Sequence, residues 1–189
     1  MIRSNLTLIF WGILVVVVDV KLGWFDVLVD PAGYFLIFHA LRPLGAIEEK
    51  FGKARQFALG ALLASIPAMF GSSPTQLTFF LETAFAICLN WLICTGILTL
   101  ATAQGNVILS ASALRTRTLN VAASVVNTLV VAIALARPEV ARVFVLPTVG
   151  FSLVVMTVTL LLLRSASREL VAAPEHPSMN GLEAPAAQA

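Results

Sequence analysis

Charge is what this chain has least of. Only 12% of its 189 residues are Asp, Glu, Lys or Arg, which is about half the share found in an average soluble domain. Hydrophobic residues make up 59% of the chain, and the mean hydropathy is +0.94. A water-soluble domain of this length cannot bury so much apolar surface. The composition therefore predicts a membrane protein.

Cysteine and histidine are also scarce, with two of each. Cys88 and Cys94 lie in one apolar run, six positions apart, so a helix would place them on opposite faces where they cannot bridge. We expect no disulfide framework, no zinc or other metal site and no cofactor. The twelve basic residues stand in small groups at the ends of apolar runs. This distribution is typical of membrane topology signals and does not predict nucleic-acid binding.

Apolar runs dominate the rest of the chain. Six of them are long enough to cross a bilayer at about 20 residues per span; they cover residues 5–20, 24–44, 55–70, 77–101, 119–136 and 143–163. We predict an all-α fold: an integral membrane helical bundle of about six transmembrane helices, the second one short or broken. The polar stretch 105–118 is expected to be a loop or a helix lying on the interface. Residues 1–164 would form the membrane domain, and 165–189 a disordered cytoplasmic tail rich in Ala and Pro.

Lysine and arginine positions predict the orientation. With the N-terminus in the cytoplasm, nine basic residues lie on the inner side and three on the outer side. The inner ones are Arg3, Arg42, Lys50, Lys53, Arg55, Arg115, Arg117, Arg164 and Arg168, and the outer ones are Lys21, Arg137 and Arg142. We therefore expect a bacterial cytoplasmic (inner) membrane protein with both termini cytoplasmic.

All three aspartates lie between positions 19 and 30, near the predicted outer face. Asp30 followed by Pro31 predicts a helix start, because the carboxylate caps free N–H groups and proline is tolerated in the first turn. A helix over 31–42 would be about 18 Å long, too short for a core of about 30 Å. Either 24–29 re-enters the membrane, or the bilayer thins. In the first case Asp26 and Asp30 could form an oxygen-lined site for sodium or a proton. In the commoner arrangement, Asp26 pairs with Lys21 and Asp30 only caps the helix.

Other polar residues interrupt the apolar runs. Glu82 needs a proton, a basic partner or water in such a run. Asn90 follows two turns later, and Asn120, Ser124 and Asn127 share one face of another predicted helix. These amides either line a polar path or join helices to one another, and we favour the second interpretation. The candidate ion or polar site comprises Asp26, Asp30, Tyr34, Glu82 and Asn90.

The acidic segment resembles a stretch of small uncharacterised bacterial multi-pass membrane proteins with the pattern Asp-x-Leu-Pro-Asp-x-x-Gly-Tyr. The matching residues are Asp26, Leu28, Asp30, Gly33 and Tyr34. Val29 stands where the pattern has proline, and Phe51 with Lys53-Ala54 is similar to a basic stretch that often follows. The resemblance covers residues 21–56. It supports the topology and implies no activity.

Enzyme motifs give no match. Two residue groups superficially resemble the motifs of intramembrane CAAX-type proteases: Glu48-Glu49 with Arg55, and Phe35 four residues before His39. However, the spacing from the glutamates to the arginine is wrong, and the two motifs occur in reversed order. We therefore predict no enzyme. The expected function is association within the membrane, with lipids and a second copy or another membrane subunit as partners. The alternative is a small transporter or ion-coupled carrier that uses Asp26 and Asp30.

Overall fold

The computed structural model describes residues 1–17, 21–22, 25–26, 30–69 and 76–170. Within these residues the chain forms six helices and one two-stranded antiparallel ribbon. The elements are α1 (Ile2–Val17), β1 (Lys21–Leu22), β2 (Phe25–Asp26), α2 (Asp30–Leu44), α3 (Glu49–Met69), α4 (Gln76–Ala103), α5 (Val107–Ala136) and α6 (Pro138–Glu169). The predicted helical bundle is confirmed, with the small ribbon as an addition.

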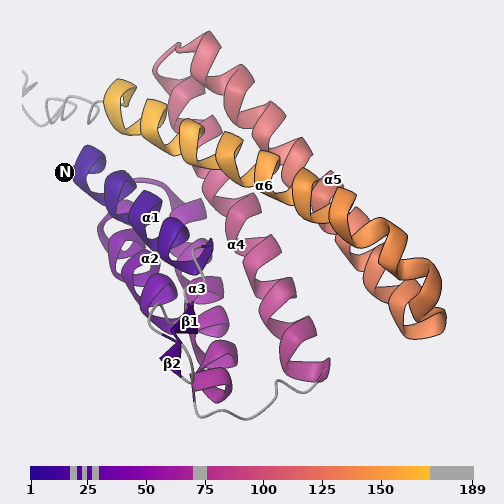
Figure 1. Ribbon diagram of the computed structural model, residues 1–189. Helices are drawn as coiled ribbons and strands as arrows, with labels where there is room; N and C mark the ends of the chain where they lie inside the picture. The colour runs from indigo at the N-terminus through magenta and orange to yellow at the C-terminus, as the bar shows by residue number, and fades with distance from the viewer. Residues whose placement is uncertain (18–20, 23–24, 27–29, 70–75, 171–189) are drawn as a thin grey trace, which may run out of the picture.

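Each helix packs against the next one along the chain, and α6 returns to pack against α1. The N-terminus lies beside the C-terminal end of α6, so the bundle closes at this end (Figure 1). Toward the opposite end, α4 and the α5–α6 pair diverge from one another (Figure 1). The buried core comes mainly from α1 to α4 and the C-terminal part of α6.

Three helical stretches are long and apolar enough to cross a membrane by length and composition: Phe80–Ala103, Val107–Ile133 and Leu146–Glu169. The helix α1 is apolar but shorter. The helix α2 has 15 residues, about 22 Å at 1.5 Å per residue. The short second helix is therefore confirmed, and the long helices support a membrane protein.

Two predicted boundaries are wrong. Residues 107–118 are neither a loop nor a separate interfacial helix, because α5 runs unbroken from Val107 to Ala136. Only Gly105, with a φ of 70°, and its neighbours turn the chain after α4. The helices α3, α4 and α6 are also longer than their predicted apolar runs, and α6 continues to Glu169, beyond the predicted boundary at residue 164. The predicted disordered tail otherwise lies outside the described residues.

Glycines bring the helices into close contact and fix their register. A Cβ on Gly33 would lie 2.6 Å from the carbonyl oxygen of Gly12, so α1 and α2 touch through their backbones. A Cβ on Gly60 would lie 3.0 Å from the Phe85 ring, which sets α3 against α4. The same two helices meet again where Gly96 faces Phe51. These contacts fix the register of α1 against α2 and of α3 against α4.

Amide side chains join α5 to α6. The Asn120 amide donates to Thr159 Oγ1 at 3.0 Å. Asn127 donates to Ser152 Oγ at 3.2 Å, and the Ser152 hydroxyl is also oriented to donate to Asn127 Oδ1. The interpretation of these asparagines as links between helices is confirmed, and a polar lining shared with α4 is wrong for them. The two cysteines are free thiols, as predicted.

Candidate functional site

The described part of the acidic segment is the start of α2. The helix begins at Asp30, followed by Pro31, as predicted from these two residues. Tyr34 lies one turn further along α2 and is only 5% exposed. The contact between Gly12 and Gly33 fixes this turn against α1, since neither backbone can move without losing it. Tyr34 is therefore held rigidly inside the bundle.

Glu82 reaches the same place from α4. Its carboxyl group lies close enough to Tyr34 for the two side chains to interact electrostatically. Asp30 lies within electrostatic range of both Tyr34 and Glu82. Glu82 is half-buried. Two carboxyl groups and one phenol therefore meet where α2 and α4 approach each other.

Ser65 of α3 belongs to the same level of the bundle. The α2–α3 register, fixed where Gly45 meets Gly52, and the α3–α4 register, fixed where Gly60 meets Phe85, together place Ser65 beside the Tyr34 and Glu82 level. Ser65 is 1% exposed and donates its hydroxyl to the Leu62 carbonyl at 2.9 Å. The sequence analysis did not select Ser65. The only feature that could have indicated it is a hydroxyl group within an apolar run.

Three other predicted polar residues lie elsewhere. Asn90 is eight residues from Glu82 on α4, about 12 Å along the axis, and makes no hydrogen bond with the described residues. The side chain of Asp26 lies outside what the structure describes, but its backbone in β2 pairs with that of Lys21 in β1. This register makes the two backbones direct cross-strand neighbours, and the ion pair between their side chains stays a prediction. His39 is exposed and stacks on Phe35, with ring centroids 6.5 Å apart.

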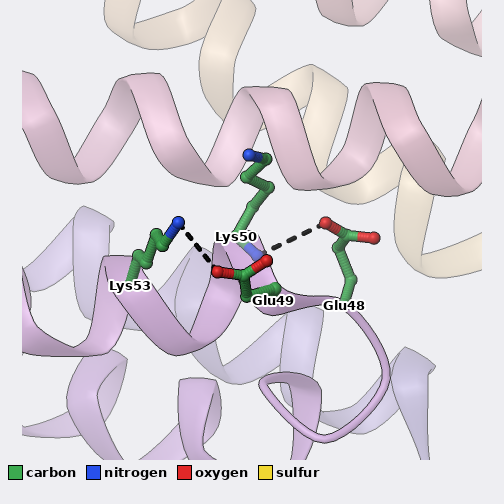
Figure 2. Close-up of polar contacts among 4 residues, drawn as sticks. All are labelled: Glu48, Glu49, Lys50 and Lys53. Carbon is green, nitrogen blue, oxygen red and sulfur yellow. Dashed lines mark hydrogen bonds and ion pairs between the residues drawn. The ribbon is translucent and has the colours of Figure 1, made fainter.

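The acidic and basic residues at the start of α3 form a surface group (Figure 2). Lys53 Nζ lies 2.8 Å from Glu49 Oε1, four residues earlier on the same helix. The backbone N–H of Lys50 donates to Glu48 Oε1 at 3.3 Å. The hydrogen bond and charge of Lys53 lower the pKa of Glu49 below its usual value. Both side chains are exposed, so the pair adds little stability.

Two arginines lie inside the bundle, stacked on aromatic rings. The guanidinium carbon of Arg55 is 4.4 Å from the centre of the Phe38 ring. Arg117, predicted to lie on a loop or an interfacial helix, stacks on Trp91 of α4 at 4.5 Å. The Nε atoms of both arginines are buried without a hydrogen-bond partner. Sequence spacing carries no signal for these pairs, which join different helices.

The comparisons with known proteins add no precedent for this arrangement. No family model, curated protein or solved structure matches the chain. The resemblance of residues 21–56 to small bacterial membrane proteins therefore stays a prediction.

The chemistry of the Asp30–Tyr34–Glu82 cluster is that of hard oxygen ligands. Carboxylate and phenolic oxygens suit a proton or a small cation such as sodium. Among the described residues, no third His, Cys, Asp or Glu joins the two carboxyl groups. The cluster has the composition of a site that holds one small positive charge between two helices.

Proposed function

We propose that this chain is an integral membrane protein that acts through association within the membrane, with α5 as its contact helix. The observation that carries this proposal is the outer face of α5, which we call the α5 face: Thr118, Ala122, Val125 and Leu129. Val125 is 53% exposed and Leu129 57% exposed. This face is apolar and uncovered within the described part of the chain.

The composition of the α5 face favours another helix as its partner. Thr118 and Ala122 are small and four residues apart, a spacing that lets two membrane helices approach closely. Helix association in lipid depends on such close packing, since lipid tails are as apolar as leucine. Val125 and Leu129 are more than half exposed on this face, so a helix of a second copy can reach it. We therefore take a second copy of the chain as the partner.

Cysteine cross-linking in membranes tests this proposal. The two native cysteines would be replaced by alanine, and single cysteines introduced at Thr118, Ala122, Val125 or Leu129. Leu63→Cys on α3 is the control, because Leu63 is exposed but lies on the opposite part of the bundle. We expect covalent dimers at the α5 positions, strongest at those four residues apart. Equal or absent cross-linking at both places would reject association through α5.

The Asp30–Tyr34–Glu82 cluster favours a second function, that of a small ion-coupled carrier. The support is that two carboxyl groups and a phenol come together between membrane helices, where each charged group is costly unless it is functional or paired. A proton or sodium ion bound there would change the contact between α2 and α4. Carriers commonly place coupling ions at such helix junctions.

Thermal stability of the purified protein in a panel of cations and pH values tests the carrier function. Wild type would be compared with Asp26→Asn, Asp30→Asn and Glu82→Gln, and with Glu49→Gln as the control that removes an exposed carboxylate. We expect a cation-dependent rise in melting temperature that Asp30→Asn or Glu82→Gln abolishes and Glu49→Gln retains. Flux into proteoliposomes would follow. Identical, unresponsive curves for all variants would eliminate the carrier.

We also propose a bacterial inner membrane location with both termini in the cytoplasm. The nine-to-three distribution of basic residues supports this orientation. It also agrees with the chain beginning and α6 ending at the same end of the bundle (Figure 1). Alkaline phosphatase fused after residue 170 should stay inactive, whereas a fusion in the α5–α6 turn at Arg137 should be active. The reverse result would invert the topology.

A further inference from the structure

Arg117 is a charged residue inside one of the three candidate spans, Val107–Ile133. Its guanidinium lies over Trp91, and its buried Nε–H has no acceptor. Among the described residues no carboxylate forms an ion pair with it. A buried donor without an acceptor requires an explanation, and a charge at membrane depth requires a counter-charge.

Two further positive charges lie at the same height. The hydrogen bonds of Asn120 with Thr159 and of Asn127 with Ser152 fix the antiparallel register of α5 and α6. Extending this register places Arg115 beside Arg164, within one turn of Arg117. Both of these arginines are exposed. Arg115 is two residues from Arg117 and so lies on a different side of α5, where it and Arg164 add positive charge at the same height of the bundle.

The surroundings of Arg117 fit a lipid headgroup. Trp91 is 41% exposed, so part of its ring faces the bilayer while the guanidinium covers another part. Tryptophan side chains are enriched where acyl chains meet headgroups. The flat fork of a guanidinium donates two parallel hydrogen bonds to a phosphate, and ring stacking holds that fork in one orientation. Basic pockets between membrane helices are known to bind anionic lipid headgroups.

We propose that Arg117, stacked on Trp91, binds the phosphate of an anionic membrane lipid in the leaflet that faces the α4–α5 turn. The phosphate would accept hydrogen bonds from the terminal N–H groups of the guanidinium, because Nε is buried, and Arg115 and Arg164 would add only long-range attraction. The site is separate from the Asp30–Tyr34–Glu82 cluster and does not depend on association through the α5 face.

Native mass spectrometry of the delipidated protein, titrated with dioleoyl phosphatidylglycerol or dioleoyl phosphatidylcholine, tests the proposal. We expect the wild type to prefer phosphatidylglycerol and Arg117→Gln to lose about fivefold in affinity for it. Arg168→Gln is the control, because it removes one exposed charge at the end of α6 without touching Trp91. Retention of the full preference by Arg117→Gln would overturn the proposal.

A second measurement keeps all arginines in place, in case Arg117→Gln does not fold. In a protein with Trp11→Phe and Trp24→Phe, Trp91 is the single tryptophan left of three. We expect brominated phosphatidylglycerol to quench its fluorescence at lower mole fraction than brominated phosphatidylcholine. Equal quenching by the two lipids would overturn the proposal. Displacement of phosphatidylglycerol by millimolar inorganic phosphate would identify a free anion as the ligand and overturn the lipid assignment.

Discussion

The backbone contact between α1 and α2 gives the sharpest test of the packing. A Cβ on Gly33 would lie 2.6 Å from the carbonyl oxygen of Gly12 and 2.5 Å from Val16 Cγ2. A backbone oxygen cannot rotate away, so Gly33→Ala must push the two helices apart. Overpacking of this kind costs about 1–3 kcal/mol, between about fivefold and more than a hundredfold in the unfolding equilibrium constant.

Alanine also favours helix over glycine by about 1 kcal/mol, and a matched substitution separates this gain from the clash. Gly150 lies in α6 with nothing within 4 Å of its would-be Cβ, so Gly150→Ala carries the gain alone. We expect Gly33→Ala to unfold more easily than Gly150→Ala by about 1–3 kcal/mol. The measurement is unfolding in mixed micelles with increasing dodecyl sulfate, followed by tryptophan fluorescence.

Gly12→Ala would encounter the same contact from the other helix, with its Cβ 2.8 Å from the Gly33 carbonyl oxygen. Once one alanine has separated the helices, the second should fit more easily. The double variant should therefore lose less than the sum of the two single losses. If Gly33→Ala and Gly150→Ala unfold at the same dodecyl sulfate fraction, the close approach of α1 and α2 is refuted.

Three further outcomes are expected. Asn127→Val should reduce stability by about 0.6 kcal/mol, and at most by about 1.7 kcal/mol. Thr128→Val is the control and should leave stability unchanged, because the Thr128 hydroxyl bonds only to its own helix. Equal losses in the two variants would contradict the α5–α6 link. Tyr34→Phe removes the hydroxyl group that interacts with Glu82 and should cost about 1–3 kcal/mol. Adding Glu82→Gln to this variant should cause little further loss, and additive losses would mean that the two groups do not interact. Lys53 lowers the pKa of Glu49, so the pair stabilises the fold at neutral pH, and this contribution disappears as pH falls through the lowered pKa. In Lys53→Met, NMR titration should show the pKa of Glu49 rising. An unchanged pKa would contradict the ion pair.

Local sequence rules predicted the elements that depend on local chemistry. Asp30 with Pro31 begins α2 as predicted, because this start signal acts within one turn. The stretch 107–118 was misread because its polar residues argue against a membrane helix. In the structure its hydroxyl groups bond back to the preceding turn, as Thr116 does to the Ser112 carbonyl, so the helix continues through them.

The candidate site was predicted in part. Asp30, Tyr34 and Glu82 were each selected for the cost of polar groups in apolar runs, but their meeting depends on how α2 and α4 pack around α3. The stacking of Arg117 on Trp91 has no local signal either, since the two residues belong to different helices. The asparagines of α5 were expected to join helices, yet their partners, 39 and 25 residues away, follow only from the register with α6.

The ring order of the helices has a consequence for biogenesis. Because each helix packs mainly on its predecessor, every new helix leaving the ribosome finds its partner already in the membrane. The seam between α1 and α6 alone must wait for the whole chain, and Leu6 of α1 and Leu163 of α6 are fully buried in the core that it closes. Synthesis of α6 is therefore the step that completes the bundle. Two separately expressed fragments, one with α1–α3 and one with α4–α6, retain the hairpins within each half and need to re-form only the α3–α4 and α1–α6 seams.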